Sequence, residues 1–114
     1  MVYTCYSESD IKSKYHVRPV TINENKFLVT KNGEIFRKMK SNNWKMIENK
    51  GNHKKGYNVI QVDKKQYMRS ALIAMAYFKL VTTKKYCIYH KNKDKLDTKI
   101  TNLKIVYLNN KKDK

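Results

Sequence analysis

The sequence predicts an α+β fold in which small β-hairpins pack around one buried, Ala-rich helix. Three observations support this class: an Asn-Gly pair between two apolar runs at Asn32-Gly33, a strand-like alternation over residues 57–62, and an apolar run over residues 71–80 that only Lys79 interrupts. The 114 residues have room for one small domain, and a hydrophobic content of 40% is enough for a packed core.

The first half of the chain has mainly β-type patterns. Residues 1–15 are ambiguous, with a short strand expected at residues 2–6, and strand-like sequence begins at His16. Apolar runs at residues 27–29 and 35–36 flank Asn32-Gly33, which is the strongest short-range signal for a hairpin. Residues 38–55 are polar and basic, and we expect them to form a long loop that contains Trp44.

The second half is predicted to contain a further hairpin, a helix and two more strands. Residues 57–62 and 66–69 should pair around a turn at residues 63–65. The run at residues 71–80 has high helix propensity and is apolar nearly all round, which predicts a buried helix with Ser70 as its N-cap. We then expect a strand at residues 86–89 that ends at His90, a helical turn within residues 96–103, a strand at residues 104–107 and a basic tail.

The charge of the chain points to a polyanionic partner. Lys and Arg number 26 against nine Asp and Glu, which gives a net charge of +17. An AT-rich genome would enrich Glu along with Lys, and Glu is not enriched here, so codon drift does not explain the excess. Because only three of the basic residues are arginine, point-charge contacts with phosphates are expected rather than bidentate reading of bases. Nucleic acid is the first candidate partner and an anionic membrane surface is the second.

Other partners and compartments have little support in the sequence. No run reaches the roughly 18 apolar residues of a membrane-spanning helix, and the first residues lack the pattern of a signal peptide. Cys5 and Cys87 lie far apart without zinc-ligand spacing, so they are interpreted as small hydrophobic residues in a reducing compartment. We therefore expect a cytoplasmic protein that is not bound to a membrane.

Two basic stretches are the candidate nucleic-acid-binding sites. The first combines lysines with one aromatic ring and contains Lys38, Lys40, Trp44, Lys45, Lys54 and Lys55. The second contains Lys91, Lys93, Lys95 and Lys99, and Arg69 is assigned to binding as well. Trp44 has two interpretations, a ring that stacks on or wedges between bases and an anchor that packs on the sheet.

The order of motifs resembles the small HNH homing endonucleases of phages and introns, together with the modular segment that often precedes their nuclease motif. The matching pieces, spread over about 80 residues, are the turn-containing strand 29–36, the Gly-Tyr strand 56–60, the Leu-Ile-Ala-Met-Ala-Tyr helix 72–77, Tyr89-His90, Asp97-Thr98 and Asn102-Leu103. The resemblance implies an HNH-like module of the ββα-metal type in the C-terminal part of the chain.

The resemblance also implies residue roles. His90 matches the general base of the family, while Asp97 and Asn102 are the residues that could hold Mg²⁺ or Mn²⁺ if the chain cleaves nucleic acid. The family motif has Asp where this chain has Tyr89, and a neutral phenol does not replace a carboxylate as a ligand of a hard cation. Without such a role, His90 would end a strand and Asn102 would bond neighbouring loop amides.

The family motif also differs from this chain at other positions. Where this chain has Asn92 the motif has an acidic residue, where it has Lys93 the motif has Gly, and where it has Ser70 the family often has His. These differences indicate an incomplete catalytic site.

The expected organisation is an N-terminal segment 1–25, a hairpin segment 26–66, an HNH-like module 67–107 and a basic tail 108–114. The predicted function is nucleic-acid binding, with duplex DNA favoured over RNA, in the cytoplasm of a bacterial or phage-infected cell. Alternatives are an active nicking endonuclease, and a basic RNA-binding or small viral effector protein.

Overall fold

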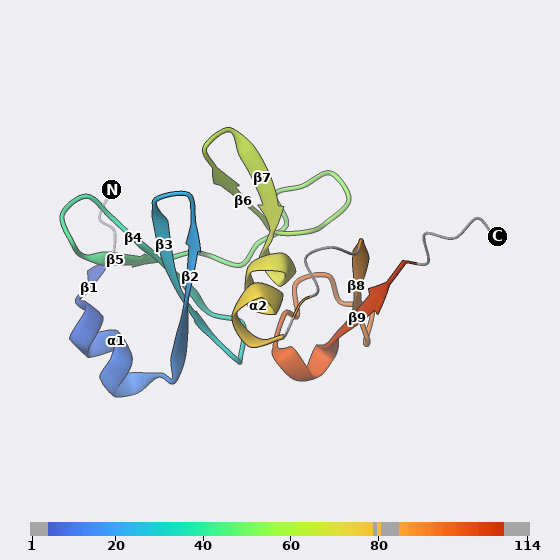
Figure 1. Ribbon diagram of the computed structural model, residues 1–114, viewed down its shortest axis with the longest axis horizontal. Helices are drawn as coiled ribbons and strands as arrows, with labels where there is room; N and C mark the ends of the chain where they lie inside the picture. Colours follow the sequence, from blue (N-terminus) through green and yellow to red (C-terminus); the bar gives the residue numbers. More distant parts are fainter. Residues whose placement is uncertain (1–4, 79, 81–84, 109–114) are drawn as a thin grey trace.

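The computed structural model describes residues 5–78, 80 and 85–108, and it has the predicted α+β architecture. A five-stranded antiparallel sheet of order β1-β5-β4-β3-β2 is accompanied by two separate hairpins, β6–β7 and β8–β9 (Figure 1). The elements are β1 (Cys5–Tyr6), α1 (Glu8–Lys14), β2 (Val17–Ile22), β3 (Asn25–Thr30), β4 (Ile35–Lys38), β5 (Trp44–Met46), β6 (Val59–Val62), β7 (Lys65–Met68), α2 (Arg69–Tyr77), β8 (Tyr86–His90), the 3-10 turn η1 (Ile100–Asn102) and β9 (Leu103–Tyr107).

The five-stranded sheet is apolar on both faces, because neighbouring residues of a strand point to opposite sides. One face contributes Phe27, Val29 and Ile35 to the main core, where α2 and the two hairpins pack. The other face contributes Leu28 and Phe36 to a second cluster, which α1 closes with one buried side chain, Ile11. The sheet therefore forms the middle layer of the molecule.

Helix α2 lies between the five-stranded sheet and the C-terminal hairpin (Figure 1). Leu72, Ile73 and Ala74 are fully buried, as the apolar run predicts. The prediction of Ser70 as N-cap is wrong: Met68 occupies the cap position without a side-chain bond, and the helix begins at Arg69. The strand β7 runs directly into α2, so no polar cap residue precedes the first turn. The predicted end at Leu80 is also too late, since the last helical residue is Tyr77.

Both predicted hairpins are present. Gly33 has φ +100° in the β3–β4 connection, a conformation that favours glycine. The β6–β7 turn has positive φ at both Asp63 (49°) and Lys64 (70°), which is the backbone shape of a type I′ turn. The C-terminal strands and the helical turn within residues 96–103 also lie where the sequence predicts them.

Two stretches have more secondary structure than predicted. Residues 38–55 do not form one long loop, because β5 pairs with β4 through Phe36↔Met46 and Lys38↔Trp44. Residues 8–14 form α1, whose first turn is capped by Ser7: its hydroxyl oxygen accepts a bond from the Asp10 amide at 3.2 Å. The sequence of α1 has one buried apolar residue, too few to give a helical periodicity. Residues 2–4 of the predicted first strand lie outside the described residues.

The expected segment boundaries do not match the sheet. The boundary at residues 25 and 26 falls inside β3, which pairs with β2 from Val17↔Thr30 to Ile22↔Asn25, so the N-terminal segment is part of the sheet. The boundary at residues 66 and 67 falls inside β7. Most of the expected tail lies outside the described residues. No helix within the described ranges is long and apolar enough to cross a membrane.

A buried arginine joins the separate parts of the fold. Arg69 is 3% exposed, and its guanidinium donates to Gly33 O (3.0 Å), Ile47 O (3.1 Å) and the side-chain oxygen of Asn58 (3.2 Å). Burial lowers the pKa of Arg69 to about 10, which leaves the group charged at neutral pH. The β3–β4 turn, which contains Gly33, also contacts the C-terminal module, because Ile100 N donates to Lys31 O at 2.9 Å. One side chain at the start of α2 thus fixes three segments.

Replacing Arg69 with methionine should destabilise the fold strongly. The substitution leaves three buried acceptors without donors, and each such loss costs about 1–3 kcal/mol, so we expect the free energy of unfolding to fall by about 3 kcal/mol or more. Urea unfolding measures this. The matched control is Arg18→Met, because Arg18 is exposed and makes one long bond to Ala76 O (3.3 Å) and a contact with the Tyr77 ring. A loss under about 1 kcal/mol for Arg69→Met would contradict the role of this side chain.

Candidate nucleic-acid interface

The connection between β8 and β9 is held by one buried asparagine. The side-chain oxygen of Asn102 accepts a bond from Asn92 N (3.0 Å), and its amide nitrogen donates to Asp97 O (2.7 Å). Its backbone carbonyl accepts from Lys91 N at 2.7 Å. Both ends of the side-chain amide are therefore used within the loop, and Asn102 makes the contacts of a loop staple.

The acidic residues of this connection also shape its backbone. The Asp94 carboxylate accepts from Leu96 N (3.0 Å), and the Asp97 carboxylate accepts from the side-chain amide of Asn92 (2.8 Å) and lies 3.4 Å from the Lys99 ammonium. Burial opposes the charged form of Asp97, but the bonds from Asn92 and Lys99 outweigh it and hold the pKa of this carboxyl below its ordinary value. Both carboxylates have partners within the loop.

His90 ends β8 on the side that faces the interior. It pairs with Leu103 of β9, and its ring centroid lies 5.9 Å from that of Tyr57. Its Nε2 atom is buried and has no hydrogen-bond partner among the described residues. Burial is the main cause that lowers the pKa of His90, Lys95 adds to it, and the two nearby carboxylates oppose it. At neutral pH His90 is an uncharged imidazole that can accept a proton.

A second loop, residues 49–57, packs against this connection. The Lys95 ammonium donates to Lys55 O at 2.6 Å and lies 4.9 Å from the centre of the Tyr57 ring. The side-chain amide of Asn49 donates to Leu96 O. Two loops about 40 residues apart in the sequence therefore meet beside His90, which the sequence did not predict.

The meeting of the two loops gathers lysines from both predicted stretches. We call this group the loop cluster; all of its side chains are exposed, and they are Lys54, Lys55, Lys91, Lys93, Lys95 and Lys99. Asp94 and Asp97 are the acidic residues of the same loops, and both are bonded to loop groups. The loop cluster is therefore a strongly positive surface with His90 at its inner edge.

The turn after His90 has a lysine at a position whose backbone favours glycine. Lys93 has φ 65°, in the left-handed region that favours glycine, and its amide donates to His90 O at 2.9 Å. The turn after His90 thus keeps a glycine-like conformation while its side chain adds a positive charge. Lysine at a strained turn position has no packing role here, because its side chain is exposed.

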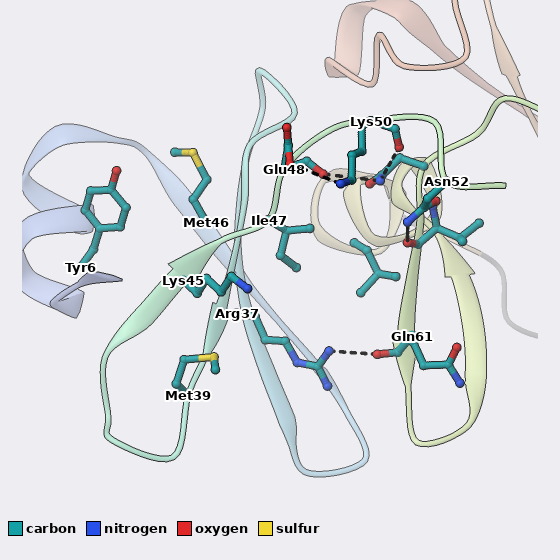
Figure 2. Close-up of a pocket in the computed structure, with 13 residues that line it drawn as sticks. Tyr6, Arg37, Met39, Lys45, Met46, Ile47, Glu48, Lys50, Asn52 and Gln61 are labelled. Atoms are coloured by element: carbon teal, nitrogen blue, oxygen red, sulfur yellow. Dashed lines mark hydrogen bonds and ion pairs between the residues drawn. The ribbon is translucent and has the colours of Figure 1, made fainter. Parts of the chain in front are cut away.

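The first predicted stretch does not form one surface. Lys54 and Lys55 belong to the loop cluster, whereas Lys38 and Lys40 lie at the β4–β5 connection, and Lys45 lines a different hollow. The hollow that Lys45 lines is a groove between β5 and β6 with a volume of about 1000 Å³, and its lining residues are drawn in Figure 2. Arg37 crosses it and donates to Gln61 O at 2.9 Å.

Two residues assigned to binding are interior residues, and these assignments are corrected. Trp44 is 3% exposed and packs with Ile11, Leu28 and Phe36, so it is the sheet anchor of the two interpretations and not a stacking ring. Arg69 is buried and donates its bonds to the protein, so it does not reach a phosphate. Charge alone does not distinguish a buried arginine from an exposed one.

The donors near His90 do not fit a divalent metal ion as they are arranged. Mg²⁺ and Mn²⁺ bind several oxygen atoms with carboxylates among them. The Asp97 and Asn102 oxygens accept bonds within the loop, and the Tyr89 side chain is 54% exposed on the face of β8 opposite to His90. Within residues 5–78, 80 and 85–108, no group of three or more His, Cys, Asp or Glu side chains comes together in a way that could hold a metal.

Sequence reasoning missed Tyr57 and Asn92. Tyr57 connects the loops through its contacts with His90 and Lys95, and Asn92 orders the turn through Asp97 and Asp94 N. The Asn92-Lys-Asp94 pattern, which is typical of an Asx turn, is the signal that could have identified Asn92. Tyr57 carries no comparable signal, because its role depends on the meeting of two distant loops.

The order of hairpin, central helix and C-terminal hairpin, with a histidine at the end of β8, defines an HNH-like fold. The chain is similar to a solved structure of DNA binding and cleavage by the HNH homing endonuclease I-HmuI, with a TM-score of 0.52 and 22% identity, over 70% of this chain and 45% of that chain. The likeness therefore spans less than half of that endonuclease and shows a shared fold. No protein-family model matches the chain, and no curated protein matches it.

The environment of His90 predicts a pH dependence of stability. Folding lowers the pKa of His90 below the ordinary 6.5. The contribution of His90 to the free energy of unfolding is therefore fully present above pH 6.5, and it is lost as the pH falls through the pKa of the folded state. The free energy of unfolding of the native chain should therefore fall more between about pH 7 and pH 5 than that of His90→Gln. Urea unfolding at several pH values tests this, with Tyr89→Phe as the neighbouring control. Equal slopes for the native chain and His90→Gln would contradict the burial of this imidazole.

Proposed function

We propose that this protein binds nucleic acid, with duplex DNA as the preferred form, through the phosphates that meet the loop cluster. The observation that carries the proposal is the contact between loops 49–57 and 91–99, made through Lys95 and Asn49, which brings six exposed lysines together. A polyanion gains most from cations held close together on one ordered surface, since each contacted phosphate releases counterions.

The chemistry of the cluster favours contacts that do not depend on base sequence. Lysine ammonium groups act as point charges and lack the planar fork with which arginine reads guanine. Asn52, which could offer an amide to a base edge, is instead bonded to Val59 through its oxygen (2.7 Å) and its nitrogen (2.9 Å). We infer that affinity comes from the phosphate backbone, and that sequence preference is weak.

The proposal of duplex DNA is supported by the fold. The similar solved structure is described as DNA binding and cleavage by an HNH homing endonuclease. We propose, from the resemblance of the sequence motifs, that this chain comes from a phage or a mobile element and acts in the cytoplasm of the host cell. A preference for RNA over duplex DNA at equal salt would favour the alternative of an RNA-binding protein, because an A-form helix presents 2′-hydroxyl groups and a shallow minor groove.

We further propose that the chain binds without cleaving. Phosphodiester hydrolysis needs neutralisation of charge on the reacting phosphate, and the residues beside His90 do not form a ready ligand set for the metal that would supply it. One observation favours the second candidate function, a nicking endonuclease: His90 is held as a neutral imidazole next to cations, which is the state a general base requires.

Salt dependence tests the phosphate contacts. If about six lysines each contact a phosphate, the logarithm of affinity falls by about 0.9 per contact for each tenfold rise in salt, which amounts to roughly a thousandfold between about 50 and 200 mM. The double variant Lys93→Ala and Lys95→Ala should reduce the slope by about 1.8.

Gel shifts or fluorescence anisotropy with a duplex measure this slope. Lys14→Ala is the control, since Lys14 is exposed on α1 and lies outside the loop cluster. A flat salt dependence would contradict the proposed interface. An equal change of the slope in Lys14→Ala and in the double variant of Lys93 and Lys95 would contradict it as well.

Nicking of a supercoiled plasmid distinguishes the two candidate functions. With Mg²⁺ or Mn²⁺ present, we expect DNA binding without nicking, and Tyr89→Asp is the variant that restores the carboxylate of the HNH motif. The result that would contradict the binding-only proposal, and establish the endonuclease, has two parts. The native chain would nick the plasmid, and His90→Ala would bind DNA with unchanged affinity but would not nick it.

A further inference from the structure

The groove between β5 and β6 is lined by several apolar side chains that stay in contact with solvent. Met39 is 40% exposed, and Tyr6, Met46 and Ile47 are partly exposed. Figure 2 shows Met39 and Met46 on the wall that carries β5, and Gln61 on the opposite wall. Single exposed apolar residues are common on protein surfaces, but several that share one groove mark a contact site.

The asparagine side chains of the groove are already bonded within the protein. Asn52 bonds to the backbone of Val59, and Asn58 donates to Lys50 O at 2.8 Å. Among the described residues, none of the buried side-chain polar atoms that lack a partner belongs to the lining of the groove. Small-molecule sites depend on a few precisely placed polar groups. The groove is therefore better suited to broad apolar contact than to a small polar ligand.

The strands beside the groove already have partners on both sides. Strand β5 lies between β1 and β4 in the five-stranded sheet. Strand β6 pairs with β7, and Val59 on β6 bonds through its N–H and its carbonyl to the Asn52 side chain. The carbonyl of Gln61, also on β6, accepts a bond from Arg37 at 2.9 Å. A segment that docks here has to satisfy its own backbone, as an amphipathic helix does.

The lining of the groove has more cations than anions. The cations are Arg37, Lys45 and Lys50, and the one acidic residue of the lining is Glu48, whose carboxylate lies 3.7 Å from the Lys50 ammonium. Arg37 donates to oxygens of Gln61 and Asn25, which carry no charge. With a net charge of +17, a second copy of the chain is repelled from this lining, whereas an acidic partner is attracted.

The groove lacks the aromatic platform on which unpaired bases stack. Tyr6 is the one aromatic residue among the described residues of the lining, and its ring packs edge-on against Phe36 with the ring centres 5.6 Å apart. Single-stranded nucleic acids bind through open aromatic faces. Methionine provides the exposed apolar surface here instead, and its flexible thioether adapts to the side chains of a protein partner.

We propose that this groove binds an acidic, amphipathic helix of a partner protein. The apolar face of the helix lies on Met39, Met46 and Ile47, and its acidic residues lie toward the lysines of the lining. None of the six lysines of the loop cluster lines the groove, so the inference is independent of the proposed nucleic-acid binding.

Two synthetic peptides test the groove. The first is a helix of about 18 residues with leucines at positions i, i+3, i+4 and i+7 and glutamates beside them, and the second has the same composition in scrambled order. The chain contains five methionines, which can be followed by ¹³C-methyl NMR. The signals of Met39 and Met46 should move and saturate with the first peptide, while that of Met75 on α2 stays in place. The scrambled peptide should bind more weakly by about 10-fold or more, because its apolar residues do not form one face.

A matched pair of variants separates the groove from the overall charge. Met39→Glu and Met75→Glu change methionines of similar exposure, 40% and 38%, and lower the net charge equally. Met39→Glu should weaken binding of the first peptide by about 10-fold or more, because it puts a like charge against the acidic helix, and Met75→Glu should have little effect. Both variants should bind a DNA duplex with equal affinity, which shows that the fold and the loop cluster are intact.

Three results would overturn the proposal. They are signals of Met39 and Met46 that do not move with the first peptide, equal affinity for the scrambled peptide, and equal weakening in Met39→Glu and Met75→Glu. If the two signals move with a single-stranded oligothymidylate and not with the peptide, the groove binds nucleic acid and the proposal is wrong.

Discussion

The fold depends on a positive charge buried at the start of α2. Arg69 satisfies carbonyls from the β3–β4 turn and from the segment after β5, together with the amide oxygen of Asn58 before β6. Each of these segments offers a carbonyl or amide oxygen at this point, so a side chain with several donors in a fixed plane is suited to join them. The loop that follows Ile47 leaves from this point, and the β3–β4 turn contacts residues 98–100 on its other side. Arg69 thus sets the positions of both loops that form the loop cluster.

Asparagine side chains shape the loops and leave the lysines free to face solvent. Asn92 and Asn102 bond to backbone groups of their own loop, and Asn52 bonds to the backbone of Val59 at the start of β6. Lysine contributes two contacts to this framework, the bond of Lys95 to the neighbouring loop and the ion pair of Lys99 with Asp97. The division of roles explains how a chain with a net charge of +17 can fold. Repulsion among the lysines is limited by exposure, and the one deeply buried cation among the described residues is an arginine with three acceptors.

Much of the fold could be predicted from local patterns. The Asn32-Gly33 hairpin, the second hairpin, the apolar helix and the C-terminal strands all have signals within a few residues, and the structure confirms them. Helix α1 and strand β5 are stabilised by contacts with distant residues such as Phe36, which a local pattern does not show. The same limit applies to the site. The lysines were visible as two stretches, but their regrouping around His90 and the burial of Trp44 and Arg69 follow from tertiary contacts.

The most direct test is lysine footprinting with and without a DNA duplex, in which acetylation of each lysine is measured by mass spectrometry. The six lysines of the loop cluster should be protected together by the duplex, while Lys14 on α1 and Lys104 on β9 should stay as reactive as in the free protein. Protection that is spread evenly over the molecule, or that is confined to lysines outside loops 49–57 and 91–99, would contradict a single phosphate-binding surface formed by the two loops.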